Sequence, residues 1–507
     1  TQKDGLARVA EFRTMVGGLH KSGLRVVLDQ VYNHTPAAGE APTSVLDQIV
    51  PGYYQRLNAT GKVENSTCCS NIATEHAMAE KIMVDGTVSW AKNYHVDGFR
   101  YDLMGHHTKA NMLKIRAALN KLTLAKDGVD GRSIYLYGEG WNFGEVADDA
   151  LFVQARQGNL GGTGIGTFSD RLRDAVRGGG PFDDDPRIQG FGSGEASDPN
   201  GAAVNGTPAE QAKRLAHDTD LVQLGLAGNL RSFTFTSASS GSTVRGDQVD
   251  YNGTPAGYAE QPDEVVTYVD AHDNETLWDT LTYKLPANLP MADRIRMNTL
   301  SLATTALAQT PSFWHAGADL LRSKSLDRNS YDSGDWFNTL DWTGADNGFG
   351  HGLPPKADNE AKWPYMKPLL ANPALKPTAA DVASASAAAA DLLKLRFSSP
   401  LFRLGTADLI NQKLTFPLSG TTPGVVTMRI DDTVGPDVDP ALKGVVVVFN
   451  STNAAVTQQV PGLSGANLTL SPVQAAGTDP VVKQTTWSAA TGTATVPPRT
   501  VAVLVQH

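Results

Sequence analysis

The sequence predicts an α/β fold built on a parallel sheet, followed by an antiparallel β domain at the C-terminal end. Up to about residue 317, amphipathic helical stretches alternate with short apolar runs, an order typical of parallel strands joined by helices. From about residue 400, short strand patterns separated by turn residues follow one another, namely GVVTMRID, GVVVVFN, TATVPP and VAVLVQ. These alternating patterns are typical of an antiparallel β-sandwich.

The first two elements are a helix and a strand. Apolar residues recur at helical spacing within residues 5–21, namely Leu6, Val9, Phe12, Val16 and Leu19. Gly23 then acts as a helix stop signal. Residues 24–28 (LRVVL) form a nearly unbroken apolar run, which predicts a strand buried on both faces and ending at Asp29.

The helix–strand pattern then repeats along the chain. We expect helices at about 75–94, 108–122, 170–178, 291–309 and 380–397. We expect strands at 96–101, in SIYLYGEGW ending at Glu139, at 163–169, at 264–270 and around 312–317 in PSFWHAG. Residues 170–262 are rich in Gly, Asp and Ser and weakly periodic, so they predict an insertion of loops and short helices.

Polar residues follow these strands at their C-terminal ends, where a (β/α)₈ barrel places its active site. The sequence therefore predicts a (β/α)₈ barrel over residues 1–399 and a C-terminal β-sandwich over 400–507. A doubly wound sheet would place a glycine-rich phosphate loop between an early strand and a helix. The run GGTGIG at 161–166 instead opens a strand, which argues against a nucleotide site.

The amino-acid composition argues against some classes of binding partner. Lys and Arg total 43 against 53 Asp and Glu, and the net charge of −10 disfavours nucleic acid and anionic membranes as partners. No run of about 18 apolar residues predicts a membrane span. Cys68 and Cys69 are adjacent, so they are two thiols or a vicinal disulfide, and alone they make a poor zinc site because zinc takes four ligands.

Four strand ends carry the polar residues of greatest chemical interest: DQVYNH (29–34), GFRYD (98–102), GEGW (138–141) and HDN (272–274). Arg100 and Asp102 are two residues apart on a strand, so their side chains share one face. A permanent cation there favours the ionised form of the carboxyl group. The pattern indicates either an ion pair at a strand end or a nucleophile that is kept charged.

Taken in order, these four segments resemble the signature segments of the α-amylase superfamily of glycoside hydrolases. Finer features resemble the type I pullulanase and limit-dextrinase branch: ENSTCC, YDLMGHH, YGEGWNFGEV, GTGIGTFSDRLRDAVRGG, VDYNGTPAGY, HDNETLWD and LLRSKSLDRNSYDSGDWFN. The resemblance implies a hydrolase that cleaves α-1,6-glucosidic bonds in pullulan and branched dextrins, with retention of configuration. It also implies that the chain supplies strands 3–8 of the barrel.

The resemblance assigns roles residue by residue. Retaining glycosidases use two carboxyl groups about 5–5.5 Å apart. The resemblance implies that Asp102 is the nucleophile, Glu139 the acid/base and Asp273 the third acid. It implies substrate contacts for a larger set, namely Tyr32, His34, Arg100, His106, Trp141, Phe143, His272, Asp327 and Arg328.

Two alternative functions remain. One is an isoamylase-like or α-1,4-acting amylase, against which ENSTCC, GTGIGTFSDR and SKSLDRNSYDSGDW argue. The other is a non-catalytic α-glucan-binding member of the superfamily, which would lack one or more of the three acids present here.

The resemblance also has implications for cofactors, for the rest of the polypeptide and for its location. No cofactor is required for the chemistry. A structural calcium ion is compatible with the superfamily, although no D-x-D-x-D-G loop marks its ligands. We expect an upstream part of the same polypeptide before Thr1, and a secreted or cell-surface bacterial protein.

Overall fold

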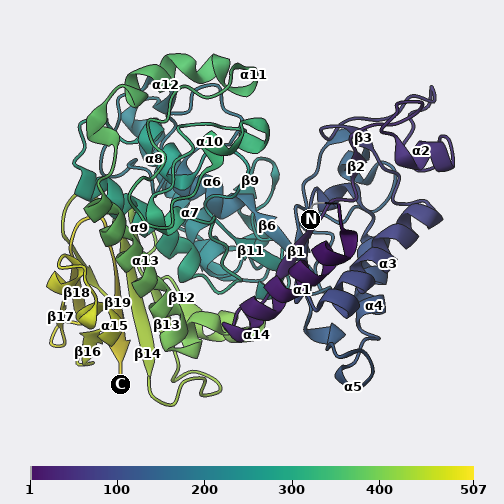
Figure 1. Ribbon diagram of the computed structural model, residues 1–507. Helices are drawn as coiled ribbons and strands as arrows, with labels where there is room; N and C mark the ends of the chain where they lie inside the picture. Colours follow the sequence, from purple (N-terminus) through teal and green to yellow (C-terminus); the bar gives the residue numbers. More distant parts are fainter. Residues whose placement is uncertain (1–2) are drawn as a thin grey trace. The chain divides into compact units, whose positions relative to one another are not determined.

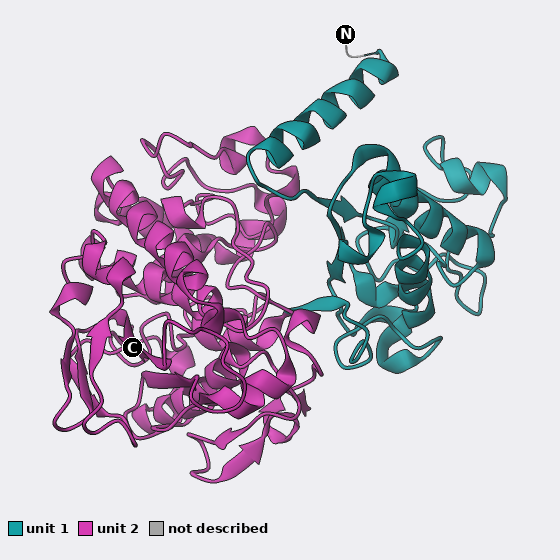
Figure 2. Cartoon of the chain, turned by 90° about the horizontal axis from the view of Figure 1, so that it is seen from below, with its two compact units in different colours: residues 1–168 teal, residues 169–507 magenta. Residues whose placement is uncertain are grey.

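The computed structural model describes residues 3–507, and the chain divides into two compact units. Unit 1 runs to Phe168 and unit 2 runs from Ser169 to His507 (Figure 2). Each unit has its own buried apolar core. Within residues 3–507, none of the helices combines the length and the apolar character needed to cross a bilayer.

Unit 1 is built on parallel strands with helices packed beside them (Figure 1). Its strands are β1 (Val27–Gln30), β2 (His34–Thr35), β3 (Ser70–Asn71), β4 (Gly98–Tyr101), β5 (Tyr135–Gly138) and β6 (Gly166–Ser169). Its helices are α1 (Gly5–Lys21), α2 (Val45–Ile49), α3 (Ala77–Tyr94), α4 (Lys109–Leu119) and α5 (Leu124–Asp127). β1 pairs with β4, β4 with β5 and β5 with β6, all in parallel.

The first helix has the predicted bounds. Asp4 caps α1 by accepting hydrogen bonds from the backbone N–H groups of Leu6 and Ala7, which leaves fewer unpaired donors at the helix start. Phe12 packs against α3, with ring centroids 5.4 Å from Trp90 and 5.6 Å from Tyr94. This aromatic contact joins the amphipathic face of α1 to unit 1.

The first strand differs from its prediction in position and burial. It begins at Val27 rather than Leu24, and Leu24 and Val27 are 56% and 45% exposed. Among the described strands, β1 has one neighbour, β4, and so lies at an edge of the sheet. The prediction of a strand buried on both faces is therefore wrong for this structure, because burial depends on neighbours as well as on apolar sequence.

Unit 2 begins with helices and short strands. Its longer helices are α6 (Asp170–Arg177), α7 (Pro208–Leu226), α8 (Leu277–Lys284), α9 (Met291–Ala306), α12 (Trp363–Leu370), α13 (Ala379–Ser398) and α14 (Ala407–Lys413). Its short helices are α10 (Asp335–Asn338), α11 (Lys356–Asn359) and α15 (Pro472–Ala476). The short strands before residue 300 are β7 (Thr234–Thr236), β8 (Thr243–Arg245), β9 (Asp250–Tyr251), β10 (Thr254–Pro255) and β11 (Val265–Thr267).

Two predictions in this part of the chain are wrong. The segment 170–262 was expected to contain only short helices, yet α7 has 19 residues. Thr207 and Glu210 form a capping box at its start and Pro208 takes the first helical position, a signal readable in the sequence TPAE.

The strand expected around 312–317 is reduced to one parallel bridge between Thr267 and Ser312. Pro311 has no N–H to donate and Gly317 turns the chain at φ +88, so the pairing stops after one bridge.

The C-terminal strands form two antiparallel sheets. One has the order β12 (Leu414–Thr415), β13 (Val425–Asp431), β14 (Gly444–Asn450), β19 (Thr500–Gln506) and β16 (Leu468–Leu470). The other has the order β15 (Val456–Gln459), β18 (Thr493–Val496) and β17 (Thr486–Ser488). Val446, Leu504 and Val496 belong to one buried cluster, so the two sheets share a core. The predicted antiparallel β region is confirmed.

The opposite side of the larger sheet packs on helices. Leu395 of α13 belongs to the same buried cluster as Val447 and Phe449 of β14. Alternating side chains of a strand point to opposite faces, which explains why Val446 and Val447 enter different clusters. The helical and strand-rich parts of unit 2 are therefore joined by a common core.

This shared core predicts a contrast between two leucines of α13. Leu395 is 0% exposed whereas Leu393 is 44% exposed. Leu395→Ala should lower the free energy of unfolding by about 2–5 kcal/mol, because it leaves a cavity in the core. The matched control Leu393→Ala should stay within about 0.5 kcal/mol. Guanidinium unfolding followed by fluorescence measures both, and equal effects would contradict the packing described here.

Candidate active site

Three neighbouring parallel strands of unit 1 bring charged side chains to one edge of the sheet. Asp29 on β1 lies opposite Arg100 on β4, and Arg100 lies opposite Tyr137 on β5. Asp102 follows the end of β4 and Glu139 follows the end of β5. Because carboxyl ends of parallel strands meet at the same edge, residues distant in sequence become neighbours here.

The guanidinium of Arg100 binds three carboxyl groups. Its Nη1 donates to both carboxylate oxygens of Asp29, each at 2.8 Å, and to Oδ1 of Asp102 at 2.9 Å. Its Nη2 lies 3.0 Å from Oε1 of Glu139. The planar guanidinium can serve several acceptors at fixed angles, which a lysine ammonium could not do.

Arg100, Glu139 and Asp102 are largely screened from solvent, whereas the side chain of Asp29 is 50% exposed. The side chains of Arg100, Glu139 and Asp102 are 8%, 11% and 22% exposed. Burial alone would lower the pKa of Arg100, but the negative charges of Glu139, Asp29 and Asp102 outweigh it and raise that pKa. Arg100 therefore stays a cation over the whole working range of pH.

Backbone and amide donors complete the partners of the two inner acids. Asn33 donates from its side-chain nitrogen to Oδ2 of Asp102 at 2.8 Å and to the backbone oxygen of Asp102 at 2.9 Å. The backbone N–H of Leu103 donates to Oε2 of Glu139 at 2.8 Å. Leu103 has φ +41, in the left-handed region, so the chain turns directly after this donor.

Gly105 is required by a close approach in the same region. A Cβ placed on Gly105 would come within 2.1 Å of the backbone oxygen of Trp141. The segment after β4 and the segment after β5 can therefore pack together only with glycine at this position.

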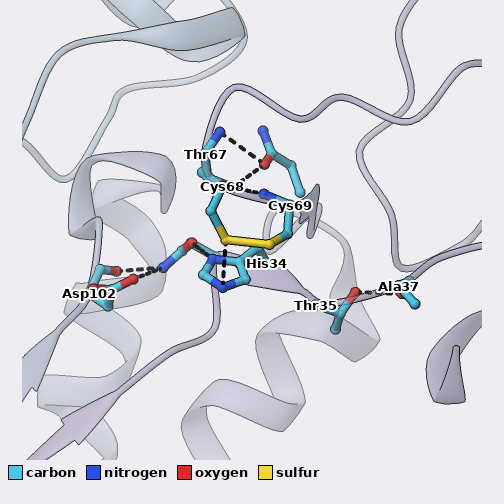
Figure 3. The surroundings of a disulfide bond; sticks show 9 residues. His34, Thr35, Ala37, Thr67, Cys68, Cys69 and Asp102 are labelled. Atoms are coloured by element: carbon cyan, nitrogen blue, oxygen red, sulfur yellow. Dashed lines mark hydrogen bonds between the residues drawn. A yellow bond between two sulfur atoms is a disulfide. The ribbon is translucent and has the colours of Figure 1, made fainter. Parts of the chain in front are cut away.

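A short antiparallel pair positions Cys68 and Cys69 next to His34, in the neighbourhood of Asp102 (Figure 3). β2 pairs with β3, so that His34 lies opposite Asn71. The two cysteines, directly before β3, form a disulfide, and Sγ of Cys68 lies 3.4 Å from Nε2 of His34. The structure thus contains the vicinal disulfide, one of the two states left open by the sequence.

Glu145 anchors the loop that carries the disulfide. It accepts hydrogen bonds from the Ser66 hydroxyl, from Asn71 at 2.9 Å and from Arg56 at 2.9 Å. Arg56 is buried and also pairs with Glu75 at 2.9 Å. Burial would raise the pKa of Glu145, but the hydrogen bonds from Ser66, Arg56 and Asn71 lower it to about 2.

The remaining predicted residues of unit 1 lie in different settings. His106 is fully buried and packs its ring 4.7 Å from the ring of Phe143, and burial lowers the pKa of His106 to about 4. Tyr32 is half-buried and donates its hydroxyl to Gln30 at 2.7 Å. Trp141 and Phe143 are half-buried. Substrate binding by these four residues stays a prediction.

Four predicted residues belong to unit 2. His272 and Asp273 are 59% and 56% exposed, with the Nε2 of His272 3.6 Å from Oδ1 of Asp273. Asp327 is buried and accepts hydrogen bonds from the backbone of Asn329 and from the side chain of Asn359, each at 3.0 Å. Arg328 lies over the ring of Phe182 at 5.6 Å. Their roles also stay predictions.

Sequence reasoning assigned no role to several residues that shape this site. Asp29 and Asn33 stand inside DQVYNH, the same segment as the predicted His34. Glu145 stands inside YGEGWNFGEV, and its partner Arg56 lies outside all quoted segments. The clustering of Asp, Asn and His in one strand end was the available signal for the first two.

Unit 2 also contains a pocket lined largely by charged side chains. Its lining includes Arg173, Arg177, Lys284, Lys362 and Glu275. Lys284 donates to the backbone oxygens of Gly178 at 2.8 Å and Ile188 at 2.5 Å, and burial lowers its pKa to about 7. None of the predicted site residues lines this pocket.

The low pKa of Glu145 predicts how the anchor responds to pH. An unfolded Glu titrates near about 4.3, so the stabilisation is complete above that pH and is lost as pH falls toward about 2. Glu145→Gln should lower Tm at pH 7, and the difference from the unmodified protein should shrink at pH 3. Thermal unfolding measures this, with the exposed Glu40→Gln as control. A difference that grows on acidification would contradict the anchor.

Comparison with known proteins agrees with the sequence resemblance. Residues 344–507 match the family described as alpha-1,6-glucosidases, pullulanase-type, C-terminal. The chain is 45% identical to "Pullulanase 1, chloroplastic" of Arabidopsis thaliana, covering 99% of this chain and 53% of that protein. It is 42% identical to "Pullulanase" of Klebsiella pneumoniae, covering 99% of this chain and 45% of that protein.

A solved structure, the maltotriose complex of PulA from Klebsiella pneumoniae, matches with a TM-score of 0.91 and 42% identity over 99% of this chain and 53% of that chain. The chain spans about half the length of the curated relatives that it matches. With identities above 40% along nearly its whole length, the chain belongs to the pullulanase family.

Proposed function

We propose that the protein carrying this chain is a starch-debranching endo-hydrolase that cleaves α-1,6-glucosidic bonds in pullulan and branched dextrins. The observation that carries the proposal is the contact of one guanidinium, Arg100, with both Asp102 and Glu139 at adjacent strand ends. A retaining glycosidase needs two carboxyl groups close together, one as nucleophile and one as acid/base. The names of the relatives support the substrate class.

In the first step, Asp102 attacks the anomeric carbon while Glu139 protonates the departing glycosidic oxygen. Arg100 and Asn33 hold one oxygen each of Asp102, so the carboxylate has a fixed orientation. In the second step, Glu139 takes a proton from water, which attacks the glycosyl-enzyme with overall retention.

Glu139 must carry a proton before the first step. In the structure, its two oxygens lie against two donors, the Nη2 of Arg100 and the backbone N–H of Leu103. One of these contacts must open for the acid to hold its proton. We propose that substrate binding opens it.

The nucleophile assignment predicts a large loss of turnover. Asp102→Asn keeps the shape of the side chain but removes its charge, so kcat on pullulan should fall by about 10⁴-fold or more. Binding of dextrin should be largely retained. Reducing-sugar release from pullulan and isothermal titration with maltotriose measure the two quantities. Near-normal turnover by the folded variant would show that Asp102 is not the nucleophile.

The acid assignment predicts a dependence on the leaving group. Glu139→Gln should lower kcat on pullulan by about 10²–10⁴-fold, because the sugar leaving group needs a proton. The rate of the first step should fall less for an aryl glycoside whose leaving group is an acidic phenol. Asp102→Asn serves as the control, because it should impair both substrates equally. Equal losses in Glu139→Gln would contradict its role as the acid.

The proposal also covers the folds of the two parts of the chain. We propose that β1, β4, β5 and β6 are strands of a (β/α)₈ barrel within residues 1–399, with a β-sandwich over 400–507. Their parallel order and the polar residues at their C-terminal ends support the barrel. Asp273 as third acid and sugar contacts by His34 and His272 rest on the sequence resemblance.

We further propose a location outside the cytosol, in a secreted or cell-surface protein. The disulfide between Cys68 and Cys69 supports this location, since disulfides persist in oxidising compartments. Assaying pullulan against a linear maltooligosaccharide separates the proposed activity from that of an α-1,4-acting amylase. A folded protein that binds both glucans but cleaves neither would favour the non-catalytic alternative.

A further inference from the structure

His34, Cys68 and Cys69 form a compact group of potential metal ligands. Within residues 3–507, theirs is the one group of His, Cys, Asp or Glu side chains found close enough to share an ion, with all three donor atoms within 4.8 Å of one another. Neighbouring ligands of a tetrahedral zinc ion, at about 2.0–2.3 Å from the metal, are roughly 3.3–3.8 Å apart. The three donor atoms are therefore already neighbours, and the two sulfurs, which are bonded to each other in the structure, must separate after reduction to reach this spacing.

The orientation of His34 is fixed by a hydrogen bond on its far side. Asn33 uses its side-chain nitrogen on Asp102, so its Oδ1 faces His34, 2.5 Å from Nδ1. An amide oxygen only accepts, so Nδ1 must carry the proton. Nε2 then carries no proton and lies 3.4 Å from Sγ of Cys68 (Figure 3).

This arrangement matches what metal-binding histidines need. Such histidines donate the second ring nitrogen to a carbonyl or carboxylate, which fixes the tautomer and aims the lone pair at the metal. Here Oδ1 of Asn33 supplies that acceptor. Cys68 is exposed, and His34 and Cys69 are partly exposed, so a reductant and an ion can reach the group.

We propose that reduction of the Cys68–Cys69 disulfide creates a site for a soft or borderline divalent cation, with Zn²⁺ as the leading ligand. A dithiol reduces the bond: it gives up two electrons and two protons, becomes a cyclic disulfide, and leaves two thiols on the protein. Zn²⁺ then binds Sγ of Cys68, Sγ of Cys69 and Nε2 of His34 and displaces the two thiol protons, with water as the fourth ligand.

The site lies next to the proposed catalytic residues, and its effect on turnover rests on the proposed function. Asn33 contacts both His34 and Asp102. Only the side chain of Asn33 therefore separates His34, the proposed metal ligand, from the proposed nucleophile. The metal also occupies the nitrogen that would otherwise meet a sugar hydroxyl. Zinc should therefore inhibit debranching by the reduced protein and leave the disulfide form unaffected.

The test is a cation titration of the protein in its two redox states. A phosphine removes the disulfide in water under anaerobic conditions, is itself oxidised to the phosphine oxide, and competes for metal less than a dithiol does. Co²⁺ is the spectroscopic probe, because thiolate ligands give a charge-transfer band and tetrahedral geometry gives strong visible absorption. Equilibrium dialysis with Zn²⁺ then counts the ions. We expect one thiolate-bound ion per reduced chain and none per oxidised chain.

Variants identify the ligands. The double variant Cys68→Ser/Cys69→Ser should lose the charge-transfer band, and His34→Ala should weaken zinc binding by about tenfold or more. His76→Ala, at an exposed histidine of the same unit, is the matched control and should bind as the unmodified protein does. The proposal is overturned if the reduced protein shows no thiolate band, or if the double serine variant binds equally well.

The effect of zinc on activity is measured in a separate experiment. Pullulan hydrolysis by the reduced protein should fall when Zn²⁺ is added and recover when a chelator removes it. Thiolate-bound metal without any hydrolysis in either redox state would overturn the proposed function and leave the metal site standing. Normal hydrolysis by the zinc-loaded protein would overturn the coupling to the active site.

Discussion

The placement of Arg100 among three carboxyl groups is the constraint on which the rest of unit 1 depends. Two carboxylates about 5 Å apart repel by roughly 3 kcal/mol at an effective dielectric constant of about 20. Asp29, Asp102 and Glu139 come from three strand ends, and a single buried guanidinium contacts all of them. The charge of Arg100 offsets the repulsion, and its planar shape fixes where the acids can point.

The segments around this cluster are positioned by a second set of contacts. Arg56 and Glu145 tie the loop of residues 66–71 to the segment that follows β5. That loop carries the disulfide, which in turn lies against His34. His34 contacts Asn33, and Asn33 contacts Asp102. The disulfide and the charged cluster are therefore linked by a short chain of direct contacts.

In unit 2, the change of sequence character near residue 400 does not coincide with a gap in packing. The strand-rich part begins with β12 at Leu414, yet β14 shares a buried cluster with α13 and α7. One face of the larger antiparallel sheet packs on these helices and the other packs on the smaller sheet. A domain boundary read from composition marks a change of secondary structure, while cooperative stability follows the shared core.

The sequence by itself determined the helices with strong periodicity, the existence and order of the parallel strands of unit 1, and the antiparallel C-terminal region. Asp102 and Glu139 were predicted because four strand-end segments, taken in order, resemble those of a known family, whereas either acid alone would have carried no such prediction. These features depend on neighbours along the chain. The exposure of β1, the loss of the strand after Pro311 and the burial of His106 depend on which segments pack against them. Only the tertiary structure could bring Asp29, Asn33 and Glu145 to their partners, because hydrogen bonds and ion pairs between distant residues leave no periodic trace in sequence.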